Sequence, residues 1–504
     1  MSTFGPGRLT ESHFLTLKMI SIIPLYFSEP VGAVCGGHLS RSMKSDGTVM
    51  EPGFRVVWTK YLWRHWIPVP HGKLRLINQE ESELRMQQGN ATGRCLRRVT
   101  HFASNFFHWG HSYMRALLPK TIPLVLTALF AMSLPVSAEN GVTADKVLFG
   151  QAAALDGPAG ALGQGMKTGL DAAFAEANKA GGVKGRKLEL KSVDDGYEPT
   201  RAIDAVKKLI DEDKVFAVVG AVGTPTSAAT QPIATAAGVP FIGAFTGAEF
   251  LREPFKPLVM NVRATYFLET EAMVEHLTKD LGASKIAIMY QDDAFGQAGL
   301  AGVKKALDKR QMQLAGEGTF ERNTVAVKGA LLSIKKAEPD AVIMISPYKP
   351  AAEFIKLAKQ IKLNSTFVNI SFVGSDALAK ELGPAGAGVV VTQVVPFPGD
   401  TTIPVVKRYQ AALKATNPDA QPGFVSLEGY LVGRAIVAGL EKADGELTRQ
   451  SMMEAVRKAG SFDLGGVKLT YGEASNRGSE HVFLTVIQGD GSFRPVDRLE
   501  KTGM

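Results

Sequence analysis

The sequence predicts an α/β protein made of two similar lobes joined by a hinge. Residues 139–504 alternate short apolar runs with amphipathic stretches of helical period, which is typical of parallel sheets covered by helices on both faces. The alternation occurs in two successive units, and a strand expected at 389–395 then leads out of the second unit into longer helices. Two lobes connected by several crossings can open and close about those crossings.

Each element of the first lobe is predicted from a local pattern. Strands are expected at short apolar runs between turn residues, and helices where apolar residues recur three and four positions apart, as at Ile203, Val206 and Leu209. In chain order we expect strand 147–154, helix 165–180, strand 188–193, helix 199–211, strand 216–219, helix 227–237 and strand 240–242.

The same patterns predict the second lobe and a return to the first. We expect, in order, helix 269–281, strand 285–290, helix 299–309, a strand near Gly318, helix 325–336, strand 341–345, helix 350–361 and strand 367–373. Helices are then expected at 403–416, 425–442 and 448–458. The predicted lobes are residues 139–262 with about 395–473, and residues 263–394 with about 474–504.

The first 138 residues differ in composition from the rest of the chain. They carry a net charge of +8, both cysteines, all four tryptophans and seven of the nine histidines, whereas residues 139–504 contain 42 basic and 42 acidic side chains. The overall charge therefore does not describe a basic surface on the α/β part, and no nucleic-acid partner is expected. We interpret the two parts as unrelated pieces of coding sequence.

Residues 114–138 are predicted to be a cleavable secretory signal peptide. The stretch has a basic start at Met114-Arg115, an apolar run at 122–134 that is too short for a membrane span, and the small-residue site Val136-Ser137-Ala138. We expect export to the periplasm with Glu139 as the mature N-terminus, and residues 1–113 to be a non-native, disordered upstream extension. A basic cytoplasmic domain tethered by an uncleaved segment is the alternative.

The mature part offers no evident catalytic machinery. It contains no cysteine, which excludes disulfides, thiolate nucleophiles and thiolate metal sites from residues 139–504. It also has only two histidines and no HExxH, GxSxG or Walker motif. The paired carboxylates Asp194-Asp195 and Asp292-Asp293 are neighbours at strand ends, and neighbours on a strand point to opposite faces. We expect a binding protein rather than an enzyme, with no metal and no cofactor.

Several stretches of the mature chain resemble type I periplasmic solute-binding proteins of ABC transporters, in the leucine/isoleucine/valine-binding family. They occur in family order and cover essentially all of residues 139–504: ALDGPAGALGQGMKTGLDAAFAEANKAGGVKGRKLEL from Ala154, VDDGYEPTRA from Val193, VVGAVGTPTSAATQPIA from Val218, YQDDAFGQAGLAG from Tyr290 and LEGYLVGRAIVAGL from Leu427. The resemblance implies two Rossmann-like lobes, a hinge of three crossovers, and a monomeric clamp that closes on one small-molecule ligand and is read by an ABC permease of the inner membrane.

The resemblance also places a carboxylate site on the first lobe. In the family, the loop that corresponds to residues 220–226 supplies a hydroxyl and backbone amides, with Thr226 at the expected position and Thr224 beside it. Phe245 and Thr246 would add a carbonyl and a second hydroxyl, although strict alignment puts Gly247 at the family's threonine. The alternatives are a helix N-cap for either threonine of the first loop and a plain turn for the second loop.

In the second lobe the resemblance assigns an acidic residue to the ligand's ammonium group. Asp376 has that position, and the alternative is that it caps the helix expected at 377–382. Aromatic walls for an apolar side chain are expected from four residues: Phe295, Tyr348, Tyr430 and Tyr197. Leu162 replaces a family aromatic and Phe295 replaces a tyrosine, which makes leucine itself doubtful as the ligand.

Transport is the expected function. A sensory or regulatory module could use the same clamp, but a receptor would need a membrane span after the clamp and a regulator a basic DNA-binding head, and neither pattern follows the lobes in this sequence. The expected ligand is an amino acid or an analogue of one, and small amides and aromatic carboxylates are the alternatives.

Overall fold

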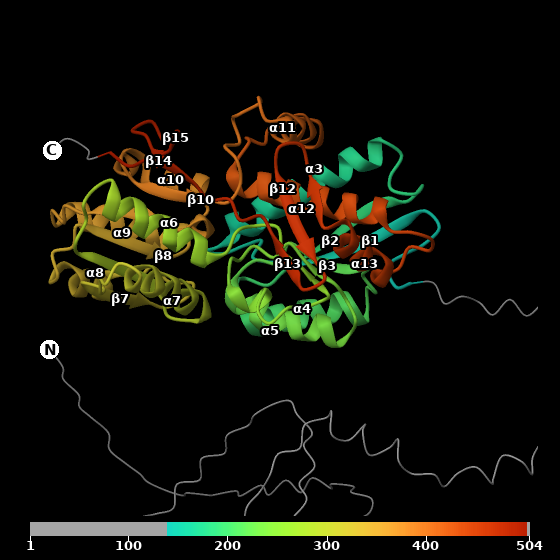
Figure 1. The fold of residues 1–504 in the computed structure, drawn as a ribbon, viewed down its shortest axis with the longest axis horizontal. Helices are drawn as coiled ribbons and strands as arrows, with labels where there is room; N and C mark the ends of the chain where they lie inside the picture. Colours follow the sequence, from blue (N-terminus) through green and yellow to red (C-terminus); the bar gives the residue numbers. More distant parts are fainter. Residues whose placement is uncertain (1–138, 501–504) are drawn as a thin grey trace, which may run out of the picture. The chain divides into compact units, whose positions relative to one another are not determined.

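The computed structural model describes residues 139–500, which form two α/β lobes (Figure 1). The predicted signal peptide and upstream extension lie outside the described residues. In the part of the chain that is described, no helix is long and apolar enough to cross a membrane. The predicted fold class, two α/β lobes with parallel sheets, is confirmed.

The first lobe contains a five-stranded parallel sheet in the order β2-β1-β3-β4-β5. Helices α3 and α12 lie on one face of this sheet, and α4 and α5 lie on the other (Figure 1). The strands are β1 (Lys146–Ala153), β2 (Lys187–Asp194), β3 (Ala217–Val219), β4 (Phe241–Ile242) and β5 (Val259–Met260). The helices are α3 (Gly160–Lys179), α4 (Pro199–Asp211), α5 (Thr224–Ala236), the 3₁₀ turn η1 (Glu249–Leu251), α11 (Pro404–Thr416), α12 (Phe424–Lys442) and α13 (Arg449–Ala459).

The second lobe contains a seven-stranded sheet in the order β15-β14-β10-β9-β8-β6-β7, in which β14 alone runs opposite to the other strands and pairs antiparallel with β10 and β15. Its strands are β6 (Ile286–Gln291), β7 (Gly316–Phe320), β8 (Ala341–Ile345), β9 (Thr366–Asn369), β10 (Val390–Gln393), β14 (Phe483–Ile487) and β15 (Phe493–Val496). Its helices are α6 (Tyr266–Lys279), α7 (Ala294–Asp308), α8 (Lys328–Lys335), α9 (Tyr348–Gln360), η2 (Ser371–Val373), α10 (Ser375–Leu382) and η3 (Gly383–Gly386).

Three segments connect the lobes, at residues 261–265, 394–403 and 479–482. A small antiparallel sheet precedes the last segment and consists of β11 (Ser461–Asp463), β12 (Lys468–Gly472) and β13 (Ser475–Gly478). Because β13 pairs with β12 and lies beside β5 of the first lobe, the last crossing begins after Gly478 rather than near residue 473.

Helix α12 is buried along most of its length because it packs closely against α3. At Gly169 of α3 a Cβ atom would lie 2.0 Å from the carbonyl oxygen of Ser426, so only glycine allows this approach. The sequence-based start of α3 at residue 165 was wrong, since the helix already begins at Gly160. Gly163 lies inside this first turn, where a Cβ would come within 1.9 Å of the Ala154 carbonyl oxygen.

Two other predicted boundaries were also wrong. Helix α7 begins at Ala294 instead of residue 299 because the carboxylate of Asp293 accepts a hydrogen bond from the Phe295 amide at 2.9 Å and caps the helix. Strand β9 ends at Asn369 instead of continuing to residue 373. The following residues form η2, whose Ser371 amide donates to the carboxylate of Glu269 at 2.9 Å. Capping and tertiary hydrogen bonds set these ends.

Candidate ligand-binding site

The two predicted loops of the first lobe lie side by side at the carboxyl ends of β3 and β4. Gly223 has φ of 106°, which glycine adopts readily, and its amide donates to the carbonyl of Phe245 at 3.3 Å. This contact brings the hydroxyls of Thr224 and Thr246 to 2.7 Å from each other. Thr246 also accepts a hydrogen bond from the Ala248 amide at 3.2 Å. Two residues that are 22 positions apart in sequence therefore form one buried hydroxyl pair.

Thr226 makes different contacts. Its buried hydroxyl donates to the backbone carbonyls of Val222 and Gly223. Neither threonine side chain caps α5, because Gly223 is the N-cap residue and the helix has no side-chain cap. A ligand-binding role for Thr226 stays a prediction, but its single proton is directed at the backbone.

A group of five buried aromatic rings, here called the aromatic cluster, lies between the lobes. Phe372 is central, with ring centroids 4.5 Å from Phe295, 5.3 Å from Phe245 and 6.0 Å from Tyr197, and Tyr266 packs on Phe295 at 5.6 Å. Tyr197 has φ of 60°, an uncommon backbone conformation for a large side chain. Because such strain concentrates at functional sites, this cluster is the centre of the candidate site.

Phe372 and Tyr266 were not among the residues predicted from the sequence. Phe372 immediately precedes the Gly374-Ser375-Asp376 stretch, and Tyr266 is the first residue of the helix that follows the first crossing. Each stands at the end of a strand or crossing, where ligand-facing residues of open α/β sheets are found. That position was the available signal, but one sequence does not show which of several neighbours points inward.

Buried charges lie beside the aromatic cluster, on the first crossing. The guanidinium carbon of Arg263 lies 4.6 Å from the ring centre of Phe245, a cation–π distance. Its nitrogens lie 3.4 Å from a carboxylate oxygen of Glu428 and 4.0 Å from one of Glu269, and it donates to the Ser371 hydroxyl. Burial raises the pKa of Glu428 to about 7, and the positive charge of Arg263 opposes that shift.

Direct contacts join the lobes across the site. The hydroxyl of Tyr197 accepts a hydrogen bond from the side-chain amide of Gln291 at 3.2 Å. At one rim the carboxylate of Glu198 contacts Arg322 at 2.9 Å and Asn323 at 2.6 Å. At another place the Tyr348 hydroxyl accepts from the Ala161 amide at 3.5 Å. The lobes are therefore in contact over the aromatic cluster, as in a closed clamp.

Asp376 also bridges the lobes, but in an unexpected way. It lies in the first turn of α10 and does not cap that helix, whose N-cap is Gly374. Its carboxylate instead accepts from the amide of Phe424, the first residue of α12 in the other lobe, at 3.0 Å. The residue keeps an exposed surface, while protein atoms around its carboxyl group raise the pKa to about 6. The ammonium-binding role remains a prediction.

The other predicted site residues are distributed around this centre. Leu162 is buried and, with Asp376, lines a cavity of about 250 Å³ between α3, α10 and the start of α12. Tyr430 lies away from the aromatic cluster, because its hydroxyl donates to Glu176 at 2.6 Å in the interface between α12 and α3. The structure thus brings together Thr224, Phe245, Thr246, Phe295 and Tyr197, and it leaves Tyr430 out.

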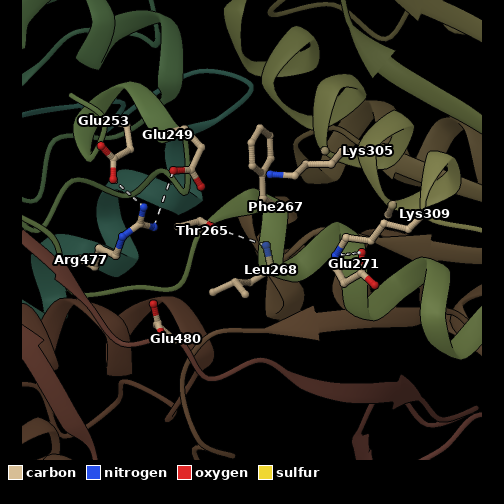
Figure 2. Close-up of a pocket in the computed structure, with 12 residues that line it drawn as sticks. Glu249, Glu253, Thr265, Phe267, Leu268, Glu271, Lys305, Lys309, Arg477 and Glu480 are labelled. Atoms are coloured by element: carbon tan, nitrogen blue, oxygen red, sulfur yellow. Dashed lines mark hydrogen bonds and ion pairs between the residues drawn. The ribbon is translucent and has the colours of Figure 1, made fainter. Parts of the chain in front are cut away.

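A second cavity of about 410 Å³ lies between the lobes beside the crossings (Figure 2). Arg477 is placed there between Glu249 and Glu253, and Lys309 is paired with Glu271. Its lining is mainly charged and partly exposed, unlike the aromatic cluster. Among residues 139–500 no three histidine, cysteine or acidic side chains are grouped so that they could hold a metal ion.

The fold and the site define a type I periplasmic solute-binding protein: two α/β lobes, three crossings and a site at the carboxyl ends of the strands. Residues 146–492 match the family of periplasmic binding proteins, and the chain belongs to that family, in its branched-chain amino acid binding branch. Proteins of this family bind solutes and are not enzymes.

Curated and structural relatives agree with this assignment. The chain is 28% identical over 346 residues to the leucine-, isoleucine-, valine-, threonine- and alanine-binding protein of Pseudomonas aeruginosa. The aligned region covers 67% of this chain and 89% of that protein. It is 38% identical to a possible leucine/isoleucine/valine-binding protein from Rhodopirellula baltica, with a TM-score of 0.67 and coverage of 72% and 98%. A solute-binding protein from R. palustris, solved with benzoate, shares the fold at 21% identity, with a TM-score of 0.63 and coverage of 70% and 95%.

Proposed function

We propose that the chain is the solute-binding component of an ABC importer, which closes on a small amino-acid-like solute and delivers it to a permease. The observation that carries the proposal is the hydroxyl pair of Thr224 and Thr246 beside the aromatic cluster, enclosed where the two lobes touch. An enclosed, mainly apolar site with a few polar groups is typical of small-molecule binding.

A carboxylate is the ligand group that fits the first-lobe loops best. Thr224 is the first residue of α5, so unpaired backbone amides of a helix N-terminus accompany the hydroxyl pair. The name of the Pseudomonas relative supports leucine, isoleucine, valine, threonine and alanine as candidate ligands. The five rings of the aromatic cluster favour, as a second candidate, an aromatic carboxylate.

Export to the periplasm is part of the proposal. The family supports it, and the predicted signal peptide at residues 114–138 supplies a route. N-terminal sequencing of protein recovered from the periplasm should return Glu139 as the first residue. Recovery of any residue before Met114 in that material would contradict the predicted processing.

The ligand class is tested by thermal unfolding of the full chain with a panel of leucine, valine, alanine, benzoate and phenylacetate. A true ligand at a hundred times its Kd stabilises the folded chain by about 2.7 kcal/mol. Thr224→Ala should then weaken the best ligand by about 1.5–3 kcal/mol, the range for a hydrogen bond to a charged group. Thr226→Ala is compared with it, and because the Thr226 hydroxyl is bonded to the backbone, we expect a smaller loss of affinity there than at Thr224. If no carboxylate raises the Tm of wild type, the proposal is wrong.

A further inference from the structure

We infer that Tyr266 is a specificity-determining residue of this site: its hydroxyl joins those of Thr224 and Thr246 in a three-hydroxyl subsite that selects a carboxylate over the matching neutral amide. This inference rests on the proposed function and names a contact that the resemblance did not assign. It is carried by the position of the phenol ring, by its unpaired hydroxyl and by the donors that surround it.

The position of the Tyr266 ring is fixed by its neighbours. Tyr266 is the first residue of α6, and the hydroxyl of the N-cap residue Thr265 accepts from the Leu268 amide at 3.2 Å, which holds this helix start in place. The ring packs against Phe295 on one side. On the other side it fills the space next to Gly247, where a Cβ would lie 2.6 Å from Cδ1 of the ring.

Gly247 explains a departure of the sequence from the family. Strict alignment puts Gly247 where the family has its binding threonine, and the structure puts Thr246 in the hydroxyl pair instead. A threonine at 247 would collide with the Tyr266 ring and with its backbone amide, each within 2.7 Å of a Cβ at that position. The tyrosine ring at 266 therefore requires a residue without a side chain at 247.

The hydroxyl of Tyr266 is buried and makes no hydrogen bond to the described residues. Burial raises the pKa of Tyr266, and the positive charge of Arg263 and the nearby hydroxyls of Thr246 and Thr224 oppose that rise. A buried O–H without an acceptor costs about 1–3 kcal/mol. Native proteins rarely leave such a group unpaired, so the geometry points to an acceptor supplied by the ligand.

The surrounding groups favour an acceptor that carries negative charge. The hydroxyls of Thr224, Thr246 and Tyr266 carry three protons, and the hydrogen bond between the two threonines uses one of them. The other two protons can be donated to a ligand. The guanidinium carbon of Arg263 lies 6.0 Å from the ring centre of Tyr266. Its Nε faces a carboxylate oxygen of Glu428 at 3.4 Å, and its Nη1 has no hydrogen-bond acceptor in residues 139–500. A carboxylate only accepts hydrogen bonds, and charge-assisted bonds are roughly twice as strong as neutral ones.

The hydroxyls, rather than net charge, provide the selection. Arg263 is already faced by Glu428 and Glu269, so its charge is largely balanced within the protein. The Glu269 carboxylate is held in place by Ser371 and Thr392 and so is not free to rotate toward Arg263. Removing one O–H at Tyr266 should therefore change selectivity more than it changes the fold.

The test compares wild type with Tyr266→Phe in the full chain, using two matched probe pairs: leucine with leucinamide, and benzoate with benzamide. Calorimetric titration gives the Kd values. For the carboxylate that wild type binds, the variant should bind about 10- to 100-fold more weakly, whereas the amide should change by less than about threefold. Tyr430→Phe is the matched control, because its hydroxyl is bonded to Glu176 away from the site, and it should leave both Kd values unchanged.

The possible outcomes separate this inference from the proposed function. If wild type binds neither carboxylate, the proposed function fails. If wild type binds a carboxylate and Tyr266→Phe binds it equally well, or loses acid and amide equally, Tyr266 is a packing residue and the inference fails. Wild type itself must also prefer the acid over its amide by at least about tenfold. That second comparison needs no variant, so a wild type without this preference would contradict the inference even if Tyr266→Phe does not fold.

Discussion

Two arginines near the crossings each lie between two glutamates, but in opposite surroundings. Arg263 is 1% exposed and lies 3.4 and 4.0 Å from Glu428 and Glu269. The side chain of Arg477 is 34% exposed and lies 2.8 and 3.8 Å from Glu253 and Glu249 (Figure 2). The surface arginine thus has the shorter distances. The shorter distances do not make the surface ion pairs more important for stability. Water screens a surface pair and can replace either partner, whereas a buried charge that loses its partner has no substitute.

The largest expected effect is at the buried arginine. Arg263→Ala leaves two buried carboxylates without their cation, and this should lower the free energy of unfolding by about 3–5 kcal/mol. Arg477→Ala is the matched control and should cost less than about 1 kcal/mol. Urea unfolding of both variants measures the two values. Equal losses would contradict the conclusion that burial, rather than distance, separates the two sites.

The next effect is a pH dependence at Glu428. Its pKa is raised in the folded chain from 4.5 to about 7, so the folded chain holds a proton that the unfolded chain releases at lower pH. Stability from this group is therefore present below about pH 4.5 and is lost as the pH rises through 7. A shift of this size corresponds to about 3 kcal/mol. Glu428→Gln cannot ionise and should gain stability relative to wild type by about that amount between pH 4 and pH 8.

Urea unfolding at several pH values tests this prediction. Asp195 has a buried carboxyl group whose pKa is also raised to about 7, so wild type alone would mix the two contributions. The difference between wild type and Glu428→Gln isolates one of them. A difference that is constant from pH 4 to pH 8 would mean that Glu428 titrates normally in the folded chain.

The sequence alone was enough for the architecture but not for these charge clusters. Apolar runs such as those of β6 and β8 predict a buried strand within one or two residues, because burial on both faces leaves a continuous signal. The ends of elements were less predictable, since a side-chain cap at Asp293 and a tertiary bond at Ser371 decide them. No local pattern encodes such contacts.

Contacts between residues that are distant in sequence explain why only part of the site could be predicted. Thr224 and Thr246 meet because β3 and β4 are neighbours in the sheet, so the strand order supports that part of the prediction. Arg263 and Glu428 are separated by 165 positions and lie on a crossing and a helix. Their contact depends on how α12 packs, which no spacing rule reveals.

The smallest expected effect concerns Asp376, which is intermediate between the two arginine sites: the residue is exposed, yet its carboxyl group is largely surrounded by protein. Its bond to the Phe424 amide links the lobes only when they touch. Asp376→Ala should therefore weaken ligand binding by about 1 kcal/mol, or roughly fivefold. Asp376→Asn keeps an acceptor oxygen and should bind nearly as wild type. Because the bond does not involve the ligand, leucine and its amine-free analogue 4-methylpentanoate should respond equally in calorimetric titrations. A loss confined to leucine in Asp376→Asn would instead place this carboxylate on the ligand's ammonium group.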